Sequence, residues 1–420
     1  ANARERIMSQ AQVKDLPAVS DCRADFPALQ QEVNGHPLAY LDSAASAQQP
    51  DVVIDTVARY QQRDHSNVHR GVHTLSHRAT EAYEGARDKL QAFINAASRS
   101  EIVLTSGATE SINLVAQSFC RPRLQPGDQI LITYLEHHSN IVPWQLVCEQ
   151  TGAELVVAPI DDDGALEMQA FEAQISARTR MIAVAHVSNA LGTVDPVEDI
   201  IALAQTRDIP VLLDGAQGVP HMAIDVQSLG CDFYAFSGHK MFGPTGTGVL
   251  YGRESLLDAM LRYQGGGDMI LEVSFDGTIY NELPYKFEAG TPNIAGVIGL
   301  GAAVDYLCSI GMHRIADHER SLLDYMMQKL VDIEGVRLIG TASNKASVQS
   351  FLVDDIHAHD LGTILDHQGV AIRTGHHCAM PVMEFFGVPG TARASLGLYN
   401  NRADVDQLAD AIVKAKQIFS

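Results

Sequence analysis

The chain has 420 residues, too many for one small hydrophobic core, and we therefore expect two domains of unequal size. Its formal net charge of −21 argues against nucleic acid and anionic membranes as partners, because phosphate binding requires clustered Lys and Arg. No apolar run approaches the length of a membrane span, and residues 1–20 contain no hydrophobic segment of a signal peptide, which favours a cytoplasmic location.

The first 298 residues predict an N-terminal arm followed by a large α/β domain. Residues 1–30 are polar and irregular, as in an arm with a short helix, and apolar residues then recur at helical spacing from about residue 78. Beyond this helix, short apolar runs alternate with helix-like segments, which is typical of βαβ units and a mainly parallel sheet over residues 31–298. The predicted strands cover residues 101–105, 129–133, 154–158, 181–185, 209–214 and 231–236.

The character of the sequence changes near residue 300. A long helical stretch is predicted from about residue 298 to 331, and short strands and helices mix after it. Residues 299–420 therefore predict a smaller α+β domain. Its expected strands lie at residues 336–339, 348–353, 370–373 and 393–396, with helices at 359–368 and from about 402.

The most informative pair of residues is Asp214 and Lys240, which lie 26 positions apart. Each follows a predicted buried strand, and ligands collect at the carboxyl ends of parallel strands. A pyridoxal phosphate (PLP) enzyme needs a lysine that holds the cofactor as a Schiff base and an acid that pairs with the pyridinium nitrogen. The alternative is that Asp214 caps a turn and Lys240 is a solvated surface lysine.

The turn after residues 101–105 is a candidate phosphate site. Residues 105–111 read Thr-Ser-Gly-Ala-Thr-Glu-Ser and open a helix, whose first N–H groups can bind an anion, with the hydroxyls of Ser106 or Thr109 as further donors. Ser237 and His239, next to Lys240, would complete the site. A purely structural turn is the alternative, because such turns are often rich in Gly, Ser and Thr.

Two adjacent histidines, His137 and His138, follow the strand predicted at residues 129–133. Successive side chains of an extended segment point to opposite sides, so this pair is a poor chelate for one metal ion, and we predict no metal site. A flat imidazole that stacks on the pyridine ring fits the PLP hypothesis better, and His137 is the candidate. The alternative is a hydrogen-bonded core histidine.

Cys378 lies in a Gly-containing loop beside two histidines and downstream of Arg373. These surroundings can favour an exposed thiolate, whereas a buried inert cysteine is the alternative. No CxxC motif is present, so neither a disulfide framework nor a zinc ribbon is indicated, and most of the other five cysteines are expected to be buried. Those five are Cys22, Cys120, Cys148, Cys231 and Cys308.

Two arginines come from neighbouring predicted strands of the small domain, Arg373 and Arg393. A PLP enzyme that acts on an amino acid needs a cation for the α-carboxylate, and a planar guanidinium suits this role. Arg393 is the stronger candidate, with Asn189 as an amide partner. Either arginine could instead form a surface ion pair.

From about Phe26 to its C-terminus the chain resembles the group II cysteine desulfurases, also called selenocysteine lyases, of the Suf type, within the class V aminotransferases. The form Arg-x-Gly-His-His-Cys at residues 373–378 separates this group from the group I enzymes. The other matching segments are residues 41–46 (Leu-Asp-Ser-Ala-Ala-Ser), 67–71 (Asn-Val-His-Arg-Gly), 136–140 (Glu-His-His-Ser-Asn), 214–217 (Asp-Gly-Ala-Gln), 237–240 (Ser-Gly-His-Lys) and 287–292 (Phe-Glu-Ala-Gly-Thr-Pro).

The resemblance implies a PLP-dependent transferase of fold type I, with a mainly parallel seven-stranded sheet in the large domain. It also implies a homodimer with active sites at the subunit interface, near which residues 67–70 of the partner lie. At the cofactor ring, the implied roles are Lys240 as Schiff-base lysine, Asp214 as pyridinium partner, Gln217 as donor to the ring hydroxyl and His137 as stacking residue. The implied phosphate site consists of Ala108, Thr109, Ser237 and His239, with Thr291 of the second subunit. The substrate would contact Arg393, Asn189 and Arg373, and Cys378 would accept the sulfur.

The implied reaction converts L-cysteine to L-alanine, with Lys240 moving the Cα proton and Cys378 taking the sulfur as a persulfide. An acceptor of the SufE or SufU type would then receive the sulfur for iron–sulfur cluster assembly, and L-selenocysteine is a further implied substrate. The alternatives are another PLP reaction on this scaffold, such as that of an aminotransferase or a kynureninase-like hydrolase, and a sulfur carrier without catalysis. Neither alternative PLP reaction has a use for an exposed Cys378.

Overall fold

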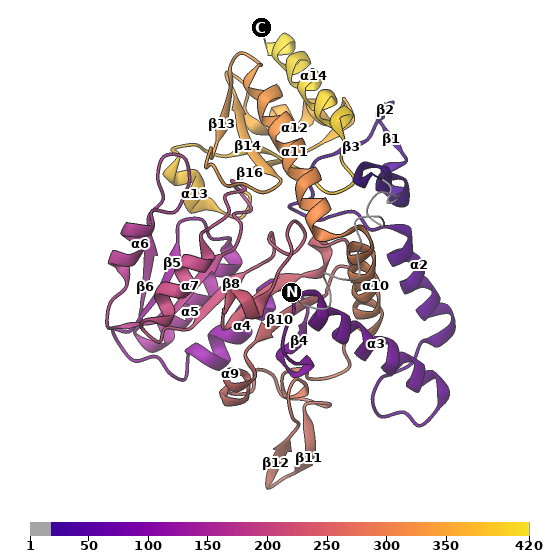
Figure 1. Ribbon diagram of the computed structural model, residues 1–420, viewed down its shortest axis with the longest axis vertical. Coiled ribbons are helices and arrows are strands. Elements are labelled where there is room, and N and C mark those ends of the chain that lie inside the picture. Colours follow the sequence, from indigo (N-terminus) through magenta and orange to yellow (C-terminus); the bar gives the residue numbers. More distant parts are fainter. Residues whose placement is uncertain (1–17, 420) are drawn as a thin grey trace, which may run out of the picture.

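A seven-stranded sheet forms the centre of the computed structural model, which describes residues 18–419 (Figure 1). Its strand order is β4-β10-β9-β8-β7-β5-β6, and β5 to β9 pair in parallel, while β10 is antiparallel to both of its neighbours. The mainly parallel sheet expected of fold type I is thus confirmed. The strands are β4 (Ile102–Thr105), β5 (Gln129–Thr133), β6 (Glu154–Ala158), β7 (Thr179–Ala185), β8 (Val211–Asp214), β9 (Phe233–Ser237) and β10 (Gly248–Gly252).

The central strands are buried on both faces, which explains their continuous apolar runs. In β8, Leu213 packs into the core cluster on one face and Leu212 into the cluster on the other. In β9, Tyr234 and Phe233 divide in the same way. The helices of this part are α2 (Asp51–Arg59), α3 (Thr74–Phe93), α4 (Ala108–Val115), α5 (Val142–Thr151), α6 (Met168–Gln174), α7 (Val197–Gln205), α8 (Val226–Leu229), α9 (Glu254–Ala259) and α10 (Ile294–Ile310).

A second, antiparallel sheet of four strands lies above the first in Figure 1, in the order β13-β14-β17-β16. Its own core cluster joins it to the helices of the C-terminal part. Its strands are β13 (Val336–Ile339), β14 (Val348–Val353), β16 (Arg373–Gly375) and β17 (Thr391–Ser395), and the helices are α11 (Met312–Val331), α12 (Ala358–Asp366), α13 (Met380–Phe385) and α14 (Arg402–Phe419). The predicted domain limits at residues 30 and 298 stay a prediction.

The long helical stretch predicted from about residue 298 to 331 consists of two helices, α10 and α11. The chain breaks at Gly311, whose φ of 94° favours glycine, and α10 and α11 meet there at an angle of 76°. α10 packs against α2 and α3, whereas α11 packs against α14 and the small sheet. Among the described residues no single helix is long and apolar enough to cross a membrane, and only the bent pair of α10 and α11 meets that criterion of length and composition.

Several short strands were not predicted. β15 (Val370–Ala371) pairs in parallel with β3 (Ala39–Tyr40), so the strand expected at residues 370–373 is two pieces, β15 and β16. β11 (Ile270–Ser274) and β12 (Gly277–Tyr280) form a hairpin that projects from the large part, and β1 (Glu32–Val33) pairs with β2 (His36–Pro37) (Figure 1).

The described end of the predicted arm packs on the body of the protein. Residues 19–25 and 27–29 form short 3₁₀ turns, and Phe26 is buried against the rings of Phe242 and Tyr399. Residues 1–17 of the predicted arm lie outside the described residues.

Candidate active site

A cavity of about 220 Å³ lies at the carboxyl ends of β7, β8 and β9. This edge collects ligands in open α/β sheets, and segments of the C-terminal part close the cavity from the opposite side. Thr291 is exposed and lies outside this cavity, as does Ser106. The predicted residues that line the cavity are Ala108, Thr109, His137, Asn189, Asp214, Gln217, Ser237, His239, Lys240, Arg373, Cys378 and Arg393.

Asp214 and Lys240 are delivered by adjacent strands. Asp214 is the last residue of β8 and is buried, and its Oδ1 accepts a hydrogen bond from the Ala216 N–H at 3.0 Å. Lys240 ends a single turn that directly follows β9. Burial raises the pKa of Asp214 and lowers that of Lys240 to about 8, while attraction between the two groups opposes both shifts. The carboxyl group of Asp214 and the amine of Lys240 can therefore both exchange protons with a ligand bound between them.

The predicted phosphate turn lies at the start of α4, where the backbone approaches closely. The Ala108 N–H donates to Ser237 Oγ at 2.8 Å, which joins this turn to the turn that carries Lys240. A Cβ on Gly248 of β10 would lie 2.3 Å from the Cα of Gly107, so this crossing requires glycine. With Thr109 and His239 also lining the cavity, the turn offers a helix N-terminus and hydroxyl donors to an anion.

His137 is held as a neutral ring. Its Nδ1 accepts the Ser139 N–H at 3.1 Å, and the Ser139 hydroxyl lies 2.8 Å from the same atom. Burial, and after it the positive charge of Lys240, lowers the pKa of His137 to about 3. A neutral, fixed imidazole on the cavity wall is suited to lie against an aromatic ligand. Ser139 was missed because a lone serine in a turn gives no signal of its own.

Four polar atoms of residues in the cavity wall are buried without a hydrogen-bond partner among the described residues. They are Gln217 Oε1, Asn189 Oδ1, His377 Nδ1 and Arg393 Nε. The amide nitrogen of Gln217 donates to the Ala44 carbonyl at 2.7 Å, so the atom left without a partner is its oxygen, which is an acceptor and not the donor that the resemblance implied. Buried polar atoms normally have partners, and four such atoms around one cavity indicate a polar ligand.

Arg393 is a buried cation at the end of the cavity supplied by the small sheet. Its guanidinium donates to the Asn189 carbonyl at 2.9 Å and to Asp42 Oδ1 at 3.1 Å. The ion pair considered for Arg393 therefore exists, but it lies in the cavity wall and not on the surface. Asp42, 351 positions away in sequence, could not be found by spacing. Arg373 is partly buried and lines the same wall.

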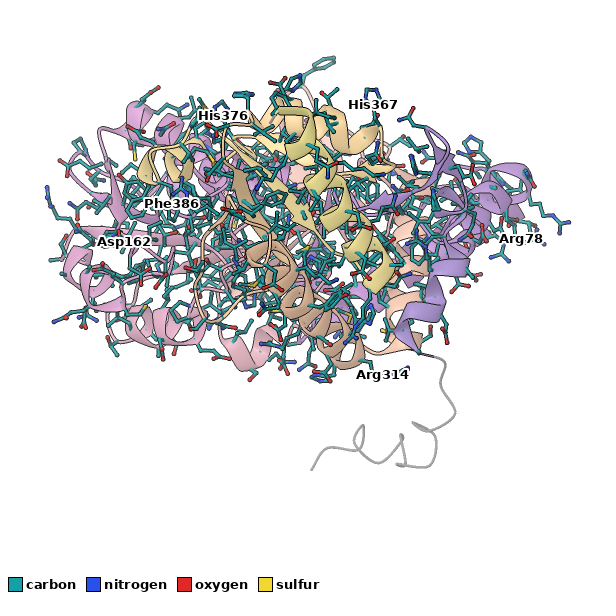
Figure 2. All side chains as sticks on the ribbon, turned by 90° about the horizontal axis from the view of Figure 1, so that it is seen from above. Arg78, Asp162, Arg314, His367, His376 and Phe386 are labelled. Atoms are coloured by element: carbon teal, nitrogen blue, oxygen red, sulfur yellow. The ribbon has the colours of Figure 1, made fainter. Side chains whose placement is uncertain are left out.

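Cys378 lies between β16 and α13, in a loop where His377 and Cys378 both have a φ of 55°. Non-glycine residues rarely adopt this conformation, so contacts must hold it. The Asn189 amide donates to the His377 carbonyl at 2.6 Å, and the His138 N–H donates to the Cys378 carbonyl at 2.8 Å. The loop thus places the partly exposed thiol of Cys378 in the cavity wall, while the exposed His376 lies at the periphery (Figure 2).

The other five cysteines follow the prediction that most of them are buried. Four of the five are buried, as expected, but Cys308 is exposed because its position on α10 faces away from the core.

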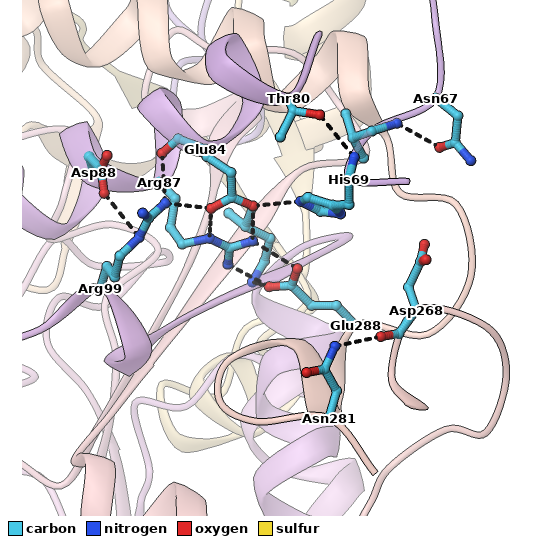
Figure 3. Close-up of polar contacts among 12 residues, drawn as sticks. Asn67, His69, Thr80, Glu84, Arg87, Asp88, Arg99, Asp268, Asn281 and Glu288 are labelled. Atoms are coloured by element: carbon cyan, nitrogen blue, oxygen red, sulfur yellow. Dashed lines mark hydrogen bonds and ion pairs between the residues drawn. The ribbon is translucent and has the colours of Figure 1, made fainter. Parts of the chain in front are cut away.

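The segments around His69 and Thr291 meet elsewhere, on the side of the molecule that carries α3. A separate pocket of about 230 Å³ lies between them, and a polar network holds its walls (Figure 3). At its centre the fully buried Arg87 binds both carboxylate oxygens of Glu288, at 2.7 and 2.9 Å, and also Glu84. His69 binds Glu84 at 2.8 Å. Within one chain these segments do not reach the catalytic cavity.

Comparison with known proteins agrees with this site. Residues 39–408 match the family "Aminotransferase class-V". The cysteine desulfurase of Serratia proteamaculans (strain 568) is 51% identical over 397 residues, 94% of this chain and 98% of that protein, and that of Salmonella agona (strain SL483) is 50% identical over 95% and 98%.

Two solved structures are also similar. The crystal structure of the Escherichia coli cysteine desulfurase CsdA superposes with a TM-score of 0.90 at 41% identity and covers 97% of this chain and 100% of that one. The apo structure of the cysteine desulfurase from Thermococcus onnurineus NA1 gives 0.91 at 38% identity, over 95% and 98%. The chain therefore belongs to the class V aminotransferase family and, within it, to the cysteine desulfurases.

Proposed function

We propose that this protein is a PLP-dependent cysteine desulfurase that converts L-cysteine to L-alanine and leaves the sulfur on Cys378 as a persulfide. The observation that carries the proposal is that the pair of Asp214 and Lys240 lines one cavity with Cys378, which was predicted separately from sequence. An aminotransferase or a kynureninase-like hydrolase would need the first two residues only.

The residues of the cavity fit PLP. The first turn of α4, with Ser237 and His239, offers donors for the phosphate, and Gln217 Oε1 is an unpartnered acceptor in the wall. Lys240 would hold the cofactor covalently, and Asp214 would keep the pyridine nitrogen protonated. When bound, PLP supplies an electron-poor ring that stabilises negative charge at the substrate Cα. His137 would lie against that ring.

Lys240 is the proposed base for the Cα proton of cysteine. Its pKa of about 8 places a substantial fraction of the side chain in the neutral, basic form near neutral pH, as a general base requires. On the opposite wall, Arg393 and Arg373 would bind the substrate carboxylate, and Asn189 would add an amide. The Asp42 carboxylate orients the Arg393 guanidinium for this contact.

Cys378 is the proposed sulfur acceptor. Its thiolate would attack the sulfur of the bound substrate, so that an S–S bond forms while the C–S bond breaks and its electron pair stays with the carbon. Protonation of that carbon gives alanine, and Cys378 carries one additional sulfur atom. The net change, cysteine plus thiol to alanine plus persulfide, balances without an external oxidant.

The finer expectations belong to the same proposal. We propose a cytoplasmic homodimer in which the partner's His69 and Thr291 segments approach the site, and an acceptor protein of the SufE or SufU type that passes the sulfur to iron–sulfur cluster assembly. L-selenocysteine is a proposed second substrate, which needs Cys378 less because selenium leaves more easily. The location of both segments outside the cavity of their own chain supports the dimer.

The test compares wild type, Cys378→Ser and Cys308→Ser, the last as a matched control on the exposed face of α10. We expect Cys378→Ser to abolish alanine and persulfide formation from cysteine, while Cys308→Ser retains both. Assays with and without candidate acceptors, and with selenocysteine, examine the finer points. Desulfuration of cysteine by Cys378→Ser at the wild-type rate would contradict the proposed role, and transfer of the amino group to a keto acid would favour an aminotransferase.

A further inference from the structure

A second cavity, of about 480 Å³, lies between the segment that follows β7 and helix α11. It shares no lining residue with the catalytic cavity, and its volume is within the range of about 300–1,000 Å³ typical of small-molecule sites. At the end of β7 successive residues face different cavities, since Ala185 and Val187 line the catalytic one and His186 lines the second. The second cavity therefore lies behind the catalytic site, where the two parts of the molecule meet.

Asp195 is the feature of this cavity that calls for a ligand. Its side chain is 2% exposed, and neither carboxylate oxygen has a hydrogen-bond partner among the described residues. The backbone of Asp195 is fully used, because its N–H donates to the His186 carbonyl at 3.1 Å and its carbonyl accepts the Val197 N–H at 2.8 Å. The backbone of Asp195 is thus fixed while its side chain has no partner, which is costly for a buried carboxyl group.

Glu319 of α11 adds a second buried acid from the opposite wall. It is 1% exposed, and its Oε2 accepts the Ser347 hydroxyl at 2.6 Å and lies 2.7 Å from His221 Nδ1. Its Oε1 has no partner in the described part of the chain. The two residues that carry these three unpartnered carboxylate oxygens therefore both line this one cavity.

The charges around the cavity favour a positive ligand. Glu198 and Asp199, at the start of α7, add two exposed acids to its lining, and Arg320 of α11 is the one exposed cation among the described lining residues. The buried Lys345 is already engaged, because its ammonium group donates to the carbonyls of Leu191 and Gly340. Burial and the nearby Glu136 carboxyl both raise the pKa of Asp195, a penalty that a bound cation would relieve.

We propose that this cavity binds a small organic cation through a primary ammonium group, with Asp195 and Glu319 as the acceptors. An ammonium group has three N–H donors, which matches the three unpartnered oxygens, and charge-assisted bonds of this kind are strong. No group of three His, Cys, Asp or Glu side chains in residues 18–419 is arranged to hold a metal ion, which favours an organic cation. The ammonium group can come from a simple amine or from a free amino acid, whose carboxylate would then bind Arg320.

Titration calorimetry of the holoenzyme with ethylammonium chloride tests the proposal, with potassium chloride as the control for ionic strength. We expect saturable binding of ethylammonium that is weakened about tenfold or more in Asp195→Asn and less than about twofold in Asp199→Asn, a matched loss of one charge at the exposed rim. The visible absorbance of the cofactor must stay unchanged during the titration, which shows that the amine is not reacting at Lys240.

Two further arms complete the test. Glu319→Gln should also weaken ethylammonium binding, and it replaces Asp195→Asn if that variant does not fold. L-Alanine distinguishes the source of the ammonium group: if Arg320→Gln weakens alanine binding and leaves ethylammonium binding unchanged, the site is one for amino acids. Absence of saturable binding, binding that both acid variants retain, or equal competition by potassium would overturn the proposal and leave a cavity filled by solvent only.

Discussion

The two walls of the catalytic cavity are built in opposite ways. Asp214 is the last residue of a buried strand in the middle of the seven-stranded sheet, and Lys240 lies just after the neighbouring strand. Cys378 instead lies in a loop with strained φ angles that a few hydrogen bonds hold in place. The difference matches the chemistry. Proton transfer at the cofactor requires fixed geometry, but sulfur transfer requires a thiol that is reachable from the substrate and from an outside acceptor.

The largest loss of activity should come from a substitution in the wall formed by Asp214 and Lys240, called the rigid wall below. We expect Lys240→Ala to lower the rate of alanine formation roughly 10³–10⁴-fold, because it removes both the covalent link to PLP and the base. The visible band of bound PLP should shift in this variant and remain in Cys378→Ala, so spectra and alanine assays together separate the two walls. Activity of Lys240→Ala within tenfold of wild type would show that another group is the base.

Arg393 lies in strand β17 and lines the same cavity as Cys378. We expect Arg393→Lys to lower kcat/KM for cysteine roughly 10–100-fold, mainly through KM, because lysine cannot reproduce the fork that binds Asp42 and the substrate carboxylate together. Steady-state kinetics measure this effect, with the exposed Arg121→Lys as control. An unchanged KM would remove Arg393 from carboxylate binding.

The wall formed by the Cys378 loop is called the flexible wall here. Loss of the hydrogen bond from Asn189 that restrains this loop should reduce activity less than the substitutions above. We expect Asn189→Ala to slow persulfide formation on Cys378 about tenfold, because the His377 carbonyl loses its bond to the amide and the strained loop relaxes. Hydrogen exchange of residues 375–380 should accelerate while the PLP band stays unchanged. The control is Gln407→Ala, which removes an amide that donates to the Pro37 backbone carbonyl outside the catalytic cavity. This variant should behave as wild type. Unaltered exchange in Asn189→Ala would mean that other contacts hold the loop.

The smallest effect is a pH dependence at Lys240. Only the neutral amine reacts with the PLP aldehyde, so the rate of cofactor uptake by apoenzyme should rise with pH and level off above the pKa of about 8. Between pH 7.5 and 8.5 the neutral fraction then rises about threefold, whereas an unshifted pKa of 10.5 would give about tenfold. Stopped-flow absorbance distinguishes the two outcomes, and a tenfold rise would show that burial does not shift this lysine.

Local patterns predicted the rigid wall better than the flexible one. β8 and β9 are continuous apolar runs that end in polar residues, so their positions and those of Asp214 and Lys240 could be read from the sequence. β10 was missed because Gly248 and Gly252 bound a short run that reads as a turn. The break at Gly311 was missed because helical periodicity continues on both sides of it.

The parallel sheet, the residues at its strand ends and, through family resemblance, the PLP chemistry with Cys378 could be predicted from the sequence, because they depend on short-range patterns and motif strings. The three-dimensional structure was needed to show that Asp42 holds Arg393, that Asn189 restrains the Cys378 loop, and that Asp195 and Glu319 share a second cavity. These contacts join residues more than a hundred positions apart, and their partners are chosen by how the two sheets pack and not by local propensity.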